Sequence, residues 1–405
     1  MLGLQVNITP EVVKWARETC NFTLEEAAKK IGRDPDEIAA WESGDVKPSI
    51  AQARKASEVY KRPLAVFFLP HVPKDFSTLR DFRKLPDDFP REYVPNLVFL
   101  IRQTQEHQEW VRDYLQSEGF SSLDFIGNAS IQNNPATVAL KIRSILKVHQ
   151  TEVFKCKTRD DALKLWVEAA ENIGIFVLQS GNMQYEKIAV EEARGFALSD
   201  KYAPFVFLNA QDAKSARIFT LAHELVHLWI NEPGVSNMAL KGRTLKGVDE
   251  IETYCNSVAA EVILPQSEFS TYWKTLDHND DIINRIDKTS NRFKVSKDVI
   301  TRRLLNLRAI TQKQYFEYIE MFYQEWLEYK KQEERKKQDT ETWANPYLSK
   351  VINNGRTFFR IVLGAYQGGK LSGRDMSNLL GIKIDKISKY AEKAGMKFPQ
   401  RRAFQ

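Results

Sequence analysis

The residues with the clearest chemical potential lie between positions 223 and 227. They read His223-Glu224-Leu-Val-His227, two histidines four positions apart with a glutamate after the first. The surrounding run, residues 217–230, has the apolar composition of a buried helix. Residues four apart share one face of an α-helix, so both imidazoles can bind a single metal ion. Glu224 is then placed to polarise a metal-bound water, which indicates a hydrolase. The alternative is a pair of ordinary histidines on a partly buried helix.

A catalytic zinc ion usually takes three protein ligands and keeps one coordination position open. The second helical run, residues 250–264, ends before Pro265 and offers Glu252 and Asn256 as polar candidates. These two residues are four apart and share a face, so one could bind the metal while the other orients a ligand. The sequence therefore predicts a metal site between two helices.

Other segments must position these helices. Three short apolar runs, 174–179, 193–199 and 204–209, precede the motif and are typical of strands in a small sheet. Most of the remaining chain has helical periodicity. We therefore expect a mainly α fold with a small β-sheet, of the α+β class.

The N-terminal segment, residues 9–70, reads as a bundle of short helices. Thr23 is a natural N-cap, and Glu26 three positions later completes a capping box. Gly32 ends this helix, and Pro35 suits the first position of the next one. A helix, a tight turn and a second helix form the helix-turn-helix pattern.

The stretch TLEEAAKKIGRDPDEIAAWESGDVKPS resembles the Xre-type helix-turn-helix family, and the resemblance covers residues 9–66. It implies a five-helix DNA-binding domain with Pro35–Glu42 as the recognition helix. The expected groove-facing residues are Asp34, Asp36 and Glu37, and DNA phosphates repel carboxylates. Two interpretations therefore remain, a DNA reader and a protein-docking or dimerisation module with the same fold.

The segments RGFALSDKYAPFVFLNAQDAKSARIFTLAHELVHL and ETYCNSVAAEVILP resemble the ImmA/IrrE metallopeptidase family over residues 140–310. The resemblance implies a zincin-like peptidase in which His223 and His227 bind zinc and Glu224 is the catalytic base. It makes Glu252 the third metal ligand and Asn256 its neighbour one turn further along the helix, placed to orient a ligand.

The same resemblance implies a protein target, typically a repressor or antitoxin-like regulator encoded nearby. In zincin-like folds an edge strand holds the peptide substrate in extended form, and we expect Phe205–Asn209 to be that strand. One departure from the family pattern is Cys255, which replaces a small alanine.

The basic charge gathers at the C-terminus. Residues 343–405 hold twelve Lys and Arg against three Asp and Glu, in a chain of net charge +6. An apolar helix over residues 358–366 is predicted there, followed by a helix, a turn and a second helix over residues 371–394, with basic residues around them. The candidates for DNA contact are Arg374, Lys383, Lys386 and Lys389. The alternative is a basic cap that completes the peptidase fold.

A long helix is predicted over residues 312–338, with an aromatic seam at heptad-like spacing. The seam could pair with a second chain and form a homodimer, but packing on the protein's own core is favoured. The expected divisions are a helix-turn-helix domain, a helical connection, the peptidase domain, the long helix and the basic module, at residues 1–70, 71–138, 139–310, 311–342 and 343–405.

Three widely spaced cysteines argue against a disulfide framework and favour a reducing compartment. No leader and no membrane-spanning apolar run is expected, so the predicted location is the cytoplasm. The leading hypothesis is a zinc-dependent endopeptidase fused to a DNA-binding-type regulatory domain. The alternative is a transcriptional regulator or a toxin-neutralising antitoxin with a structural or sensing metal site and no proteolysis.

Overall fold

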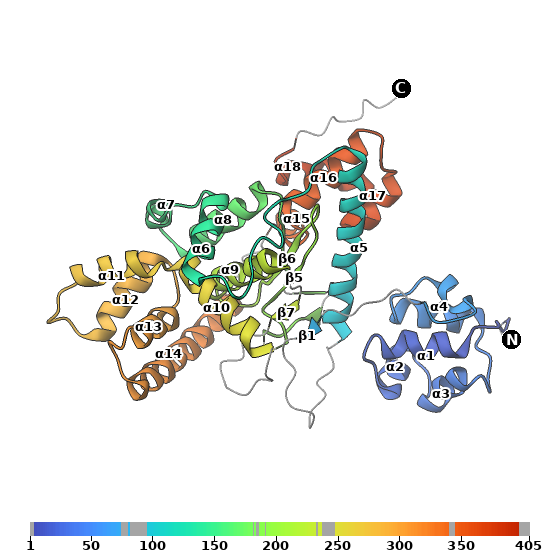
Figure 1. The fold of residues 1–405 in the computed structure, drawn as a ribbon. Helices are drawn as coiled ribbons and strands as arrows, with labels where there is room; N and C mark the ends of the chain where they lie inside the picture. Colours follow the sequence, from blue (N-terminus) through green and yellow to red (C-terminus); the bar gives the residue numbers. More distant parts are fainter. Residues whose placement is uncertain are drawn as a thin grey trace. The chain divides into compact units, whose positions relative to one another are not determined.

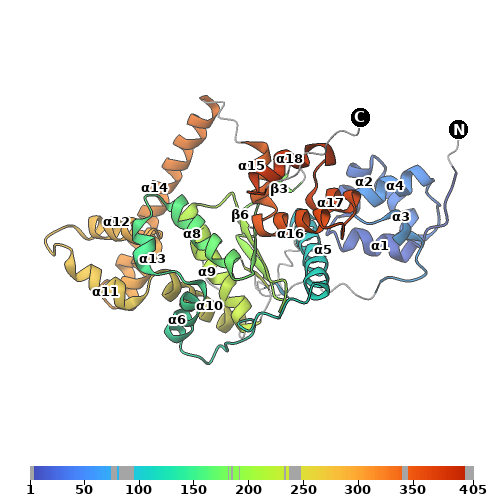
Figure 2. The ribbon, with the colours of Figure 1, turned by 90° about the horizontal axis from the view of Figure 1, so that it is seen from above.

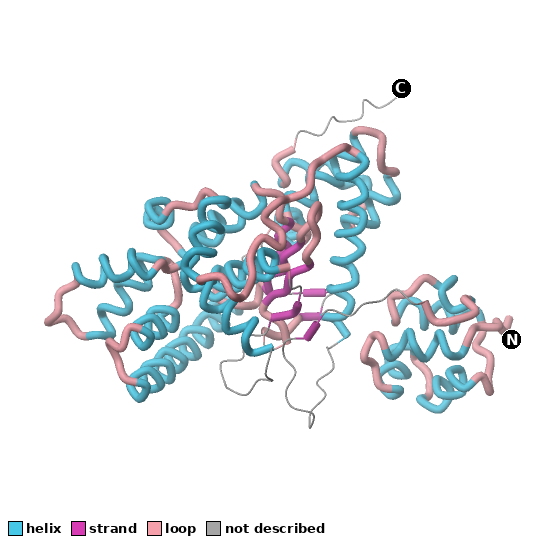
Figure 3. The backbone as a smooth tube through the Cα atoms, in the orientation of Figure 1, coloured by secondary structure: helices cyan, strands magenta, loops and turns pink. Residues whose placement is uncertain are grey.

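The computed structural model gives a mainly helical chain around a small sheet (Figure 1 and Figure 3). It describes residues 4–73, 80–81, 95–180, 182–183, 186–190, 192–231, 234–236, 248–339 and 345–396. The chain divides into two compact units, and the division falls within the long helix α5 (Pro95–Ser117). The first half of α5 belongs to the N-terminal unit and the second half, from His107 on, to the main unit.

The N-terminal unit is the predicted bundle of short helices. It contains α1 (Pro10–Glu18), α2 (Leu24–Ile31), α3 (Pro35–Ser43), α4 (Ile50–Val59) and the 3-10 turn η1 (Leu64–Phe68). The predicted capping box is confirmed, because Thr23 Oγ1 accepts from the Glu26 N–H and the Glu26 carboxylate accepts from the Thr23 N–H. Gly32 ends α2 at φ 78°, and Ile38 and Trp41 bury the inner face of α3.

The main unit is built around a sheet in the order β1-β7-β5-β6-β2. Its strands are β1 (Arg80–Asp81), β2 (Phe176–Ser180), β5 (Gly195–Leu198), β6 (Phe205–Asn209) and β7 (Gly234–Ser236). β6 pairs in parallel with β2 and antiparallel with β5, and β5 pairs antiparallel with β7. A separate hairpin of β3 (Asn182–Met183) and β4 (Glu186–Lys187) falls in the N-terminal unit. The three predicted strands are therefore confirmed.

The expectation that Phe205–Asn209 is an edge strand is wrong. β6 has β5 on one side and β2 on the other, and all five of its residues are buried. A strand whose edges are both paired has no free N–H and C=O groups to offer a peptide. The run of five buried residues is what such an interior strand requires.

Helices cover one face of the sheet and position the predicted site. α9 (Lys214–Ile230) packs on β5 and β6, and α8 (Arg159–Asn172) packs on β2 and α9. α10 (Val248–Ile263) packs on α9 and on α6 (Pro135–Leu146). The shared apolar core includes Trp229, which stacks on Phe125 with ring centroids 4.5 Å apart. Aromatic side chains of this size contribute much of the buried apolar area of such a core.

Further helices extend this core. They are α7 (Gln150–Lys155), α11 (Gln266–Thr275), α12 (Ile282–Phe293), α13 (Lys297–Asn306) and α14 (Gln312–Asp339). The seam of α14 packs on the protein's own core in its first half, where Tyr315 and Phe322 are buried. Trp326, further along the seam, is 40% exposed. The last seam residue, Tyr329, lies outside the residues whose side chains are described.

The C-terminal module covers the outer edge of β2. It consists of α15 (Pro346–Asn353), α16 (Arg356–Gln367), α17 (Gly373–Leu380), the 3-10 turn η2 (Ile384–Lys386) and α18 (Ile387–Lys393). Gly355 has φ +79°, and a Cβ there would lie 2.8 Å from the Val177 carbonyl oxygen. The N–H of Thr357 donates to Glu171 of α8 over 3.3 Å. In Figure 2 the sheet lies between α8–α10 and this module.

The ring of Phe358 lies against a second part of the main unit. It stacks on His107 of α5 with centroids 4.4 Å apart. Gln108 of the same helix donates to the carbonyl oxygens of Leu198 and Ala203. α5 and α16 therefore brace the sheet together. Within the described ranges, every helix is too short or too polar to serve as a membrane span.

Candidate metal centre

Helix α9 carries three predicted site residues into the interior. His223, Glu224 and His227 are each 0% exposed. No Gly or Pro interrupts the helix, and Asn231 ends it in the left-handed conformation at φ 56°. Burying ionisable groups without compensation is costly, so such a constellation needs partners. The arrangement is therefore a candidate metal site.

The two imidazoles of α9 meet a carboxylate from α10. The Nε2 atoms of His223 and His227 lie 3.0 Å apart, and each lies 3.2 Å from a Glu252 carboxylate oxygen. Ligand atoms from these three residues all fall within 4.8 Å of one another. Donors bound tetrahedrally at zinc distances are separated by about 3.3 Å. The observed spacing therefore fits one zinc ion.

The donor set also fits the chemistry of a catalytic site. Two histidines and one glutamate are a known catalytic zinc set, which leaves the fourth position for water or substrate. Glu252 is 16% exposed at its side chain, whereas both histidines are fully buried. The more open side of the cluster is therefore the carboxylate side.

Charge supports the role of Glu252 as an anionic ligand. Burial would raise the pKa of its carboxyl, but the facing His223 and His227 outweigh burial and hold that pKa well below its usual range. Glu252 is thus a carboxylate at neutral pH, the form that binds a metal.

Asn256 orients one of the imidazoles. Its side-chain Oδ1 lies 3.1 Å from Nδ1 of His223. An amide oxygen can only accept, so this contact favours a proton on Nδ1 and leaves Nε2 as the ring atom that can bind a metal. Nε2 is the atom that faces Glu252. Such outer contacts set the tautomer and the ring orientation of metal ligands.

Glu224 packs against the backbone of β5. A Cβ placed on Gly195 would lie 3.0 Å from Glu224 Oε1 and 2.5 Å from Cγ2 of Thr220, one turn earlier on α9. It would also lie 2.8 Å from the Phe207 carbonyl oxygen. Only glycine allows this approach without a shift of its neighbours. Sequence reasoning missed Gly195, although an isolated glycine in a strand pattern indicates close backbone approach.

The candidate DNA-binding residues do not converge in this way. Arg374 on α17 and Lys383 and Lys386 near the following turn are exposed. Lys389 is exposed too, and its Nζ lies 5.6 Å from the Tyr347 ring centroid in a cation–π contact.

Several other basic residues of the module are engaged within the protein. Lys370 pairs with Glu118, Arg356 lies 3.9 Å from Glu168, and Lys393 pairs with Glu392. The net charge of the segment therefore overstates the charge that is available to an acidic partner.

The expected groove-facing residues of the N-terminal domain are acidic and lie at the surface. Asp34 and Asp36 are exposed, and Asp34 Oδ1 accepts from the Asp36 N–H as a helix cap. Glu37 accepts from Gln52 Nε2 over 2.7 Å, which ties it to α4. The start of α3 thus carries negative charge on its outer side.

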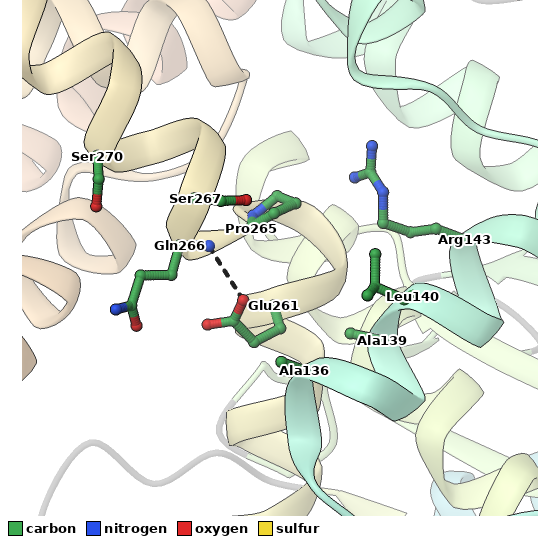
Figure 4. A pocket seen from close by; sticks show the side chains of 9 residues that line it. All are labelled: Ala136, Ala139, Leu140, Arg143, Glu261, Pro265, Gln266, Ser267 and Ser270. Carbon is green, nitrogen blue, oxygen red and sulfur yellow. Dashed lines mark hydrogen bonds between the residues drawn. The ribbon is translucent and has the colours of Figure 1, made fainter.

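A cavity of about 420 Å³ lies away from the metal ligands. Figure 4 shows its lining from α6, the end of α10 and the start of α11. Glu261 is nine residues beyond Glu252 on α10, which is about 13 Å along the helix. Glu261 pairs with Arg303 and accepts from the Gln266 N–H, so it is engaged in structure. The cluster geometry, not this cavity, identifies the site.

Comparison with known proteins finds two families that match separate parts of the chain. Residues 172–305 match the IrrE N-terminal-like domain family, and residues 13–67 match a helix-turn-helix family. An uncharacterized immunity region protein 2 of Bacillus phage phi105 is 34% identical over 91 residues. That match covers 22% of this chain and 57% of the phage protein.

Proposed function

Because this chain joins an IrrE N-terminal-like domain to an N-terminal helix-turn-helix domain, we propose that it is a zinc-dependent endopeptidase fused to a DNA-binding-type regulatory domain. The observation that carries the proposal is the convergence of His223, His227 and Glu252 from two helices. Three donors with an open fourth position are the composition of a hydrolytic zinc site.

Each residue of the site would have a separate role in amide hydrolysis. When bound, zinc would lower the pKa of a water molecule and polarise the scissile carbonyl. Asn256 keeps His223 in the tautomer that leaves Nε2 to bind. Glu224 takes the proton of the attacking water and passes it to the nitrogen of the leaving amine. Its complete burial keeps bulk water from competing for that proton.

The proposed substrate is a protein regulator, such as a repressor or antitoxin encoded nearby. The name of the phi105 relative, an immunity region protein of a phage, favours a phage or mobile-element setting. The helix-turn-helix domain supports a link to gene regulation. The proposed location is the cytoplasm, because the three cysteines occur as thiols and fit a reducing compartment.

In this proposal the N-terminal and C-terminal ends of the chain bind different partners. The acidic start of α3 suits contact with a protein at least as well as contact with DNA. Arg374, Lys383, Lys386 and Lys389 are the proposed DNA contacts of the C-terminal module. Deleting either end and measuring the salt dependence of promoter binding separates the two contributions.

The test of proteolysis is a comparison between the parent and Glu224→Gln. Each is co-expressed with the product of the neighbouring gene, and zinc content is measured on both. We expect the parent to cleave the partner and the zinc-loaded variant to hold it in a stable complex. Cleavage by Glu224→Gln at the parent rate would remove Glu224 from the mechanism. A stable complex without cleavage by either protein would favour the non-proteolytic regulator.

A further inference from the structure

β5 carries the backbone against which Glu224 packs. The Arg194 carbonyl accepts from the Asn209 N–H over 2.8 Å, so Arg194 directs its polar groups toward β6. Successive residues of a strand direct these groups to opposite edges. Gly195 and Ala197 therefore present their N–H and C=O groups to the other edge, away from β6. Gly195 is also the residue against which the Glu224 carboxylate packs.

A segment of the same chain occupies that edge. β7 pairs antiparallel with β5 in the register Gly195↔Ser236 and Ala197↔Gly234. By the alternation just described, both of these are hydrogen-bonded pairs. Neighbouring strands lie about 4.8 Å apart. Ser236 therefore occupies the position that the backbone of a peptide paired with Gly195 would take.

Among the strands that the structure describes, the other edges are less suited to a peptide. The outer edge of β2 is covered by the turn between α15 and α16, where Gly355 meets the Val177 carbonyl. The sheet continues beyond β7 to β1. A strand outside β7 would in any case lie about 10 Å from β5 and out of reach of Glu224.

We propose that β7 is an internal occupant of the peptide-binding edge, and that an extended substrate segment must displace it to pair antiparallel with β5. The inference rests on the proposed function and deepens it. The ligand is an unfolded or extended polypeptide, because strand addition uses main-chain hydrogen bonds. β7 has only three residues and can form few hydrogen bonds with β5. A longer strand, which forms more of them, can therefore displace it.

The register supplies a matched pair of variants. Ser236→Pro removes an N–H that donates to Gly195, whereas Ser236→Ala changes the same residue and keeps that N–H. Both are made in full-length, zinc-loaded Glu224→Gln protein, so that binding is measured without turnover. The probe is fluorescein-labelled β-casein, an unfolded polypeptide, and binding is followed by fluorescence anisotropy.

We expect Ser236→Pro to bind casein about fivefold more tightly, because a weakened internal strand lowers the competition. Ser236→Ala should bind like the Glu224→Gln protein. Hydrogen exchange at the Gly195 and Ala197 amides should quicken in Ser236→Pro and slow again when casein binds.

The inference would be overturned if these amides exchange faster in Ser236→Pro while all three proteins bind casein with equal affinity. It would also be overturned if, with that faster exchange, none of the three proteins binds casein. The outcome is independent of the proteolysis test. Tighter casein binding by Ser236→Pro supports the inference even where the Glu224 protein fails to cleave any partner.

Discussion

The metal centre and the C-terminal module both contain residues whose types suggest a function, but the fold arranges these residues differently. At the centre, donors from α9 and α10 converge within 4.8 Å, with both histidines buried and Glu252 partly buried. In the module, basic residues spread over several elements, and Lys370 and Arg356 pair with Glu118 and Glu168, which lie outside the module. Donor atoms that converge on one point are evidence for a chemical site. Charged residues that only accumulate along the sequence can also serve packing and docking.

Loss of a ligand should give the largest effect at the centre. Glu252→Gln keeps the size of the side chain but removes its negative charge. We expect zinc affinity to fall by more than about 100-fold, beyond the range seen for outer-shell changes. Competition with a fluorescent chelator measures it. The matched control is Glu250→Gln, an exposed residue on the same helix, and an equal loss in both variants would refute the assignment.

The docking of the module should depend on pH through His107. Burial and the nearby Lys350 lower the pKa of His107 from 6.5 to about 4. A histidine whose folded pKa lies below its unfolded pKa binds more protons when unfolded, so stability falls as pH drops from 6.5 toward 4. The His107 ring is stacked and only 5% exposed, so this pKa difference is little screened by solvent. The free energy of unfolding therefore falls by about 3 kcal/mol between neutral pH and pH 4.

His107→Phe should flatten that pH dependence of the unfolding free energy, measured by denaturant titration at several pH values. The exposed His149 provides the matched control as His149→Phe. An unchanged slope between pH 6.5 and 4 in His107→Phe would show that other groups titrate in this range.

An outer-shell change should act less strongly than loss of a ligand. Asn256→Ala removes the oxygen that fixes Nδ1 of His223, and we expect zinc affinity to fall about 10- to 100-fold. Asn256→Asp keeps an acceptor and should retain most of the affinity. The control Ser257→Ala alters the next, exposed residue. Full zinc affinity in Asn256→Ala would mean that the contact does not orient the ligand.

The smallest effect is expected at the surface of the module. If Lys383 and Lys386 contact phosphates, Lys383→Gln/Lys386→Gln should reduce the salt slope of DNA binding by about 2, or about 1 for each contact. Lys370→Gln, whose side chain pairs with Glu118, should leave the slope unchanged. Electrophoretic shift across a salt series checks both variants. Equal slopes in all proteins would favour the purely structural role of the module.

Much of the fold and the centre was predictable from the sequence. Helical periodicity places His223 and His227 on one face, and the spacing of Glu252 and Asn256 places them on a second helix. The capping box at Thr23 and the three buried strands followed from local patterns as well. Each of these features depends on short-range geometry, which sequence spacing encodes directly.

The parts that the sequence did not yield depend on contacts between distant segments. The apolar run Phe205–Asn209 does not tell which strands flank it, so its interior position in the sheet was missed. The approach of Gly195 to Glu224 and the pairing of Ser236 with Gly195 join residues about 30 to 40 positions apart. The charge count of residues 343–405 likewise could not show that Lys370 and Arg356 pair with Glu118 and Glu168, far earlier in the chain.

The most direct measurement is a crystal structure of the zinc-loaded protein with anomalous scattering recorded at the zinc edge. The account predicts one peak about 2.0 to 2.2 Å from Nε2 of His223, Nε2 of His227 and a Glu252 oxygen, with a fourth position held by solvent. A peak bound by four protein side chains would contradict a catalytic centre. The absence of zinc from these three residues would contradict the centre itself.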